Sequence, residues 1–134
     1  MIAASRAAQA YRRVESESRS PLELVVMLYD GALRFLGDAS AAVDRNDLRA
    51  RANAVSRVLA IVAELQSTLD LEKGGAVADQ LDDLYTYITS RLLDVAIKND
   101  VTAIDEARKL LMPIRDAWSQ LATQPAMAQA VGAP

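Results

Sequence analysis

The chain has 134 residues, which is enough for one domain with a substantial core and too few for two ordinary domains. Apolar residues make up 51% of the sequence and aromatic residues only 4%, a composition typical of long helices and not of a sheet protein. The formal net charge of −3 argues against a nucleic-acid partner. The absence of Cys and His excludes disulfides, thiolate metal sites and imidazole chemistry.

Residues 1–19 are predicted to form a flexible N-terminal arm and tether. An Ala-rich piece carries Tyr11, and the polar run from Glu15 to Arg19 has no apolar period. The first residues lack the basic-then-apolar order of a signal peptide, and no apolar run reaches the length of about 18 residues that a membrane helix needs. We therefore expect a cytoplasmic chain without stable membrane insertion.

The first predicted helix starts at Ser20 with unusually complete start signals. Ser20 and Glu23 have the spacing of a capping box, and Pro21 occupies the first helical position, where its missing N–H costs nothing. The helix continues to about residue 43. One apolar row steps by three and four residues through Leu22, Val25, Tyr29, Ala32, Leu36, Ala39 and Val43, and a second row contains Leu24, Leu28 and Phe35.

Two further helices are predicted over residues 48–71 and 76–98. Asn46 or Asp47 can cap the first of them, and Gly74-Gly75 is expected to close it with a left-handed residue. That helix again has two apolar rows, one of Leu48, Ala52, Val55, Leu59, Val62 and Leu69, the other of Ala54, Val58, Ile61 and Leu65. The next helix has a row of Val77, Leu81, Leu84, Ile88, Leu92 and Val95, with Tyr85, Tyr87, Leu93 and Ile97 beside it.

A fourth helix is predicted over residues 101–122, with Asp100 as its cap. Pro113 lies inside its apolar pattern, removes one backbone hydrogen bond and is expected to bend the helix. Residues 123–134 have no usable period, so we expect a frayed C-terminal tail. Short turns between long helices force neighbours to run antiparallel, which predicts an all-α, up-down four-helix bundle over residues 20–122.

The chemistry that an enzyme would need is not evident in the sequence. Asp79, Asp82 and Asp83 are read as acidic residues that favour the start of a helix, in preference to a Mg²⁺ or acid–base site. Gly74-Gly75 lacks the Lys-Ser/Thr of a phosphate loop. We therefore predict no catalytic residue, no metal and no cofactor.

The second apolar rows predict a binding surface. A bundle core can absorb some of these positions, but large exposed apolar patches on soluble proteins mark interaction sites. The groove could take an amphipathic helix, a second copy of the chain, or the chain's own arm through Tyr11. As a set, the predicted contact residues are Tyr11, Leu24, Leu28, Phe35, Val58, Ile61, Leu65, Tyr87, Leu93 and Leu110.

Several motifs in a fixed order resemble the flagellar secretion chaperone FliS family. They are Tyr11, then Ser20-Pro21, then MLYDGALRFL at 27–36, Gly74-Gly75, LYTYI at 84–88, AIKND at 96–100 and LLMPIRDAW at 110–118. The resemblance covers residues 8 to 122. It implies a cytoplasmic bundle that binds the disordered C-terminal segment of flagellin, prevents premature polymerisation and delivers flagellin to the flagellar export apparatus.

Two other readings of the residues stay open beside this one. The second apolar rows could form a homodimer or tetramer interface in a self-associating structural bundle without a client. The carboxylates could bind Mg²⁺ in an enzyme, which we consider the weakest of the three readings.

Overall fold

The computed structural model describes residues 20–123 and forms four helices, with no strand in that range. The helices are α2 (Pro21–Asp44), α3 (Leu48–Ser67), α4 (Gly75–Lys98) and α5 (Thr102–Ala122). The all-α bundle predicted from the sequence is confirmed. The N-terminal arm, including Tyr11, and the C-terminal tail after Thr123 lie outside the described residues.

The start of α2 forms as its sequence predicts. The Ser20 hydroxyl oxygen accepts a hydrogen bond from the backbone N–H of Glu23 at 3.1 Å, and Pro21 occupies the first turn. The Glu23 carboxylate accepts a hydrogen bond from the Ser20 hydroxyl at 3.2 Å, so it holds the capping side chain in place.

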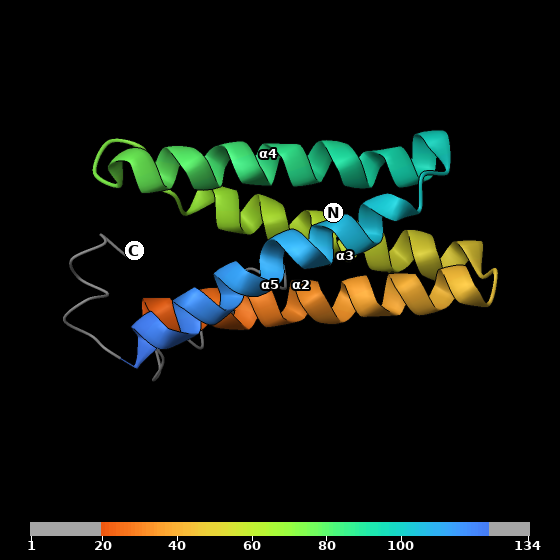
Figure 1. Cartoon of the computed structure of the whole chain (residues 1–134), viewed down its shortest axis with the longest axis horizontal. Helices are drawn as coiled ribbons and strands as arrows, with labels where there is room; N and C mark the ends of the chain where they lie inside the picture. The colour runs from red at the N-terminus through yellow and green to blue at the C-terminus, as the bar shows by residue number, and fades with distance from the viewer. Residues whose placement is uncertain (1–19, 124–134) are drawn as a thin grey trace.

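The four helices form a closed ring of antiparallel neighbours (Figure 1). α2 packs against α3 and α5, and α4 packs against the same two helices from the opposite side. α5 crosses the bundle at a slant, starting close to the end of α4 and ending beside the start of α2. α4 and α5 consequently diverge toward the C-terminal end of α5.

The core lies along the common axis of the helices and is almost purely apolar. It contains the predicted first row of α2 from Val25 to Ala39, with Val43 half-buried against it, and, from α4, Leu81, Ile88, Leu92 and Val95. Within this core the hydroxyl groups of Tyr29 and Tyr85 are hydrogen-bonded at 2.6 Å, with both side chains at most 2% exposed. Burial raises the pKa of both tyrosines.

The connection between α3 and α4 differs from the prediction. α3 ends at Ser67 and not at residue 71, and Gly74-Gly75 starts α4 where we expected it to close α3. Gly75 has φ +58°, a left-handed conformation that glycine adopts without strain. A Cβ atom on Gly74 would lie 2.5 Å from the Cβ of Ala78, which explains why a glycine is needed there.

The other two turns use left-handed asparagines. Asn46 and Asn99 have φ of 57° and 55°, and Asp47 caps α3 by accepting from the backbone N–H of Ala50 at 3.0 Å. Val101 occupies the cap position of α5, while the Asp100 carboxylate accepts from the N–H of Thr102 at 3.2 Å. α5 continues through Pro113 to Ala122.

Candidate functional site: the two edges of α4

Large apolar side chains that stay exposed are concentrated on α4. Among the described residues the exposed ones are Leu48, Leu71, Val77, Tyr87, Leu93, Ile97 and Met112, and four of these seven belong to α4. They lie on two different edges of the helix. One edge faces α5 and the other faces α3.

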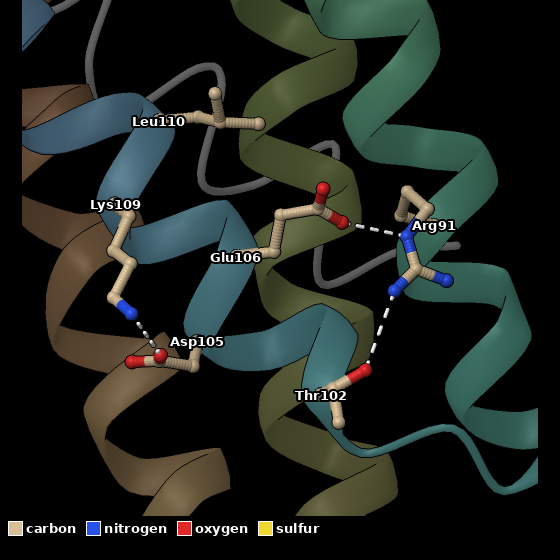
Figure 2. Close-up of a pocket in the computed structure, with 6 residues that line it drawn as sticks. All are labelled: Arg91, Thr102, Asp105, Glu106, Lys109 and Leu110. Carbon is tan, nitrogen blue, oxygen red and sulfur yellow. Dashed lines mark hydrogen bonds and ion pairs between the residues drawn. The ribbon is translucent and has the colours of Figure 1, made fainter.

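Tyr87 and Arg91 mark the edge that faces α5. The Tyr87 hydroxyl donates to Glu106 Oε2 at 2.7 Å, and Arg91 Nε donates to Glu106 Oε1 at 2.6 Å (Figure 2 shows the Arg91 contact). Val77 and Leu84 precede Arg91 by fourteen and seven residues, about four and two turns, so they lie along the same line. We call Val77, Leu84, Tyr87 and Leu110 the α4–α5 edge.

Arg91 joins three carboxylates and fastens α4 to the start of α5. Besides Glu106, its guanidinium contacts Asp94 at 3.2 Å and Asp100 at 3.0 Å. The hydrogen bond from Arg91 lowers the pKa of Glu106, and hydrogen bonding from Thr102 and then Arg91 lowers the pKa of Asp100. The hydrogen bond to Glu106 raises the pKa of Tyr87. At neutral pH Glu106 and Asp100 are therefore ionised and Tyr87 is neutral.

A shallow recess of about 430 Å³ lies over this junction. Arg91, Thr102, Asp105, Glu106, Lys109 and Leu110 line it (Figure 2). Its charges are matched, since Lys109 pairs with Asp105 at 3.0 Å and Arg91 pairs with Glu106. In residues 20–123 no group of His, Cys, Asp or Glu side chains is arranged to hold a metal ion, and no helix has the length and hydropathy of a membrane span.

The opposite edge of α4 faces α3. Gln66 on α3 donates to the Thr86 hydroxyl at 3.0 Å, and Leu93 follows Thr86 by seven residues, about two turns. Ile97 follows one turn later, where Arg51 of α3 donates to Asn99 Oδ1 at 2.7 Å. We call Leu48, Ala52, Leu93 and Ile97 the α3–α4 seam.

Between α2 and α3 the surface is organised around Phe35. Two guanidinium groups lie against its ring, Arg34 at 4.9 Å and Arg57 at 5.4 Å from the ring centre. Phe35 and Ile61 are half-buried and pack on the core. The apolar side chains between α2 and α3 are therefore less exposed than those on either edge of α4.

The structure divides the predicted contact residues into three groups. Tyr87 and Leu93 are exposed, at 46% and 45%, while Phe35, Ile61 and Leu110 are half-buried. The prediction that the second rows are open is wrong for four members, because Leu24, Leu28, Val58 and Leu65 are at most 7% exposed. A helix in a bundle buries a stripe wider than about 100°, so these four members of the second rows belong to the core.

The sequence reasoning missed several residues of these edges. Leu48 belongs to an apolar row of the helix predicted over 48–71 and Ile97 lies beside the α4 row, but neither is among the predicted contact residues. The ion-pair junction around Arg91 was not predicted, because its members come from two helices and a turn. One signal was present: Tyr87, Arg91 and Asp94 are spaced by four and three residues and so share one face of α4.

Comparisons with known proteins agree with the order of motifs in the chain. A family model described as "FliS: Flagellar protein FliS" matches residues 3–125. Three similar proteins are each named "Flagellar secretion chaperone FliS". The Salmonella typhimurium protein is 39% identical over 118 residues, which cover 84% of this chain and 87% of that protein. The Campylobacter jejuni protein is 36% identical, covering 90% and 94%, and the Escherichia coli protein is 33% identical, covering 94% and 96%.

These names describe a chaperone and not an enzyme, in agreement with the sequence-based prediction. The match extends over nearly the whole chain and includes all four helices of the bundle. The chain therefore belongs to the FliS family of flagellar proteins.

Proposed function

We propose that this protein is a cytoplasmic secretion chaperone of the flagellum that binds the disordered C-terminal segment of flagellin. Binding keeps flagellin from polymerising early and allows its delivery to the export apparatus. Membership of the FliS family and the names of the relatives support the chaperone role. We place the flagellin-binding surface on the α4–α5 edge.

The single observation that carries this proposal is the apolar surface left open along α4. Val77 is 50% exposed and Tyr87 is 46% exposed, beside half-buried Leu84 and Leu110. A soluble protein rarely leaves such a line of apolar groups uncovered without a partner. The edge is long and shallow, which suits a client that arrives unfolded.

A disordered client fits the geometry and the energetics. Coupled folding and binding typically bury about 1,000–3,000 Å², and part of the gain is lost in ordering the client. On α4 the edge runs from Val77 to Tyr87, about three helical turns. An extended segment can follow such an edge and add turns of helix where apolar side chains meet it.

Isothermal titration calorimetry with the isolated C-terminal segment of flagellin tests the proposal. We expect saturable one-to-one binding with a negative heat-capacity change, and a gain in helicity by circular dichroism. Val77→Asp places a charge on the α4–α5 edge and should weaken binding about tenfold or more. Leu71→Asp is the matched control, because Leu71 is 51% exposed in the loop before α4.

Absence of binding by the folded wild-type chain would overturn the flagellin assignment. Equal affinity of the Val77→Asp and Leu71→Asp proteins would move the client site away from this edge. Sedimentation of the same wild-type sample tests the self-associating alternative. A partner-independent oligomer that blocks flagellin binding would favour that alternative over the chaperone.

A further inference from the structure

We propose that the α3–α4 seam is a second docking site, which takes an amphipathic helix with an acidic flank. The site is separate from the proposed client surface, because Leu93 and Ile97 lie on the edge of α4 that faces α3. It is at the end of the bundle where α2 turns into α3. This second site does not depend on flagellin binding.

The register of α3 against α4 brings the apolar members of the seam together. The Arg51 guanidinium donates to Asn99 Oδ1 at 2.7 Å and to the carbonyl oxygen of Val95 at 3.5 Å. The first turns of α3 therefore lie against the last turns of α4. Leu48 and Ala52 are within one turn of Arg51, and Ile97 lies between its two acceptors.

The apolar side chains of the seam are exposed, although Leu48 and Ala52 continue an apolar row whose other end is buried. Leu48 is 65% exposed, Ile97 74% and Leu93 45%. Leu48 and Ala52 begin the row that continues through Val55 and Val62, which are at most 6% exposed. The same helix face is therefore buried at one end and open at the other.

Small side chains extend along the exposed side of α3 away from the open end of this row. Ala52, Ser56, Ala60 and Ala63 are all exposed on α3 and none carries a charge. Helices pack about 8–10 Å apart, with the separation set by the side chains at the contact. Together with the exposed Leu48 and Ile97, these residues offer a partner helix apolar anchors and close approach.

The charges beside the seam favour an acidic partner. Arg49 is exposed and makes no hydrogen bond or ion pair within residues 20–123. Arg51 bonds only to neutral groups in that range, and the Lys98 ammonium, whose side chain is 70% exposed, lies 3.9 Å from Asp94. Arg49 and Arg51 therefore have no carboxylate partner in that range and can meet carboxylates from outside, and Lys98 adds an exposed positive charge that is already paired with Asp94.

The nearby carboxylates are already engaged. Asp47 caps α3, and Asp94 and Asp100 contact Arg91 at 3.2 and 3.0 Å. Asp44 follows Asp30 by fourteen residues, about four turns, and Asp30 pairs with Arg115 of α5. Asp44 therefore faces the α5 side of α2, away from the seam. A helix with Glu or Asp beside its apolar stripe gains complementary charge at the seam, and a basic helix is repelled.

The test uses the full chain and two synthetic peptides of about five helical turns each. Both have Leu and Ile at positions i, i+3, i+4 and i+7; one carries Glu along the flank of this stripe and the other carries Lys. Fluorescence anisotropy of each labelled peptide is measured with wild type, Ile97→Asp, Arg49→Glu and two controls. The controls are Leu71→Asp in the loop and Val77→Asp on the α4–α5 edge.

We expect the Glu peptide to bind wild type about tenfold more tightly than the Lys peptide at low salt, with the difference shrinking as ionic strength rises. Ile97→Asp should lower the affinity for the Glu peptide about tenfold. Arg49→Glu should reduce the ratio of the affinities for the Glu and Lys peptides. Leu71→Asp and Val77→Asp should bind like wild type. Ile97 and Arg49 are both exposed, so the two variants should retain the helicity of wild type by circular dichroism.

Equal affinity for the two peptides would overturn the proposal, as would an Ile97→Asp protein that binds like the Leu71→Asp control. Displacement of the Glu peptide by the flagellin segment would also overturn it, because the two sites would then be one. Loss of flagellin binding in Val77→Asp without loss of the Glu peptide supports two separate sites. If the protein binds the Glu peptide but not the flagellin segment, the proposed flagellin binding is refuted and the docking site at the α3–α4 seam is supported.

Discussion

At the scale of single residues, the most constrained pair is Tyr29 and Tyr85. Their hydroxyl oxygens are 2.6 Å apart, and their rings are tilted by 58° with centres 6.5 Å apart. Each hydroxyl is buried with the other as its hydrogen-bond partner. The pair fixes α2 relative to α4 across the core, although these two helices are not neighbours in the ring.

Tyr85→Phe should lower the free energy of unfolding by about 1–3 kcal/mol, because it leaves the Tyr29 hydroxyl buried without this hydrogen bond. Removing both hydroxyls in a Tyr29→Phe/Tyr85→Phe protein should cost less than the sum of the two single changes. Urea unfolding of the four proteins measures this coupling. Strict additivity would contradict the pairing.

At the scale of the elements, two glycines differ in whether their surroundings leave room for a side chain. Gly37 lies inside α2, and a Cβ atom built there meets no atom within 4 Å. Gly74 precedes α4, and a Cβ atom there would lie 2.7 Å from the backbone oxygen of Asp70. The first glycine is dispensable and the second is required by the turn.

Gly37→Ala should stabilise the protein by about 0.5–1 kcal/mol, since alanine loses less backbone entropy in a helix. Gly74→Ala should destabilise it by about 1–3 kcal/mol, because the new methyl group forces backbone atoms apart. The midpoints of thermal unfolding should therefore move in opposite directions. Two shifts of the same sign would show that the α3–α4 turn adapts to a side chain.

At the scale of the whole molecule, the ion pairs of Arg91 with Asp100 and Glu106 link α4 to the start of α5. They therefore help to close the ring of four helices. Glu106 and Asp100 have pKa values below their ordinary values of 4.5 and 3.8. The unfolded chain therefore binds protons at a higher pH than the folded chain does. The stabilisation is complete at neutral pH and is lost as the pH falls below about 4.5, through the folded pKa values.

Glu106→Gln should flatten the loss of stability between about pH 5 and pH 2, because this carboxyl no longer titrates differently in the two states. Tyr87→Phe should flatten it less, since the hydrogen bond from Arg91 is the larger cause of the lowered pKa. Urea unfolding across this pH range measures both slopes. An unchanged slope in Glu106→Gln would exclude Glu106 from the acid response.

The sequence by itself determined the helices, their order and their antiparallel arrangement. Apolar spacing of three and four residues sets the helix faces, and local caps such as Ser20 and Asp47 set where helices begin. The order of short motifs was sufficient to indicate the FliS family. These features are local, so one chain read in order contains them.

The tertiary structure decided which apolar residues are core and which are open. Val58 and Leu48 occupy equally good positions in apolar rows, yet Val58 is fully buried and Leu48 is 65% exposed. The difference arises because Val58 lies in the middle of α3, inside the bundle, whereas Leu48 is the first residue of α3, at the end of the bundle, where no other helix covers it. Periodicity gives the direction of a side chain around its own helix, and only the packed neighbours determine what covers it.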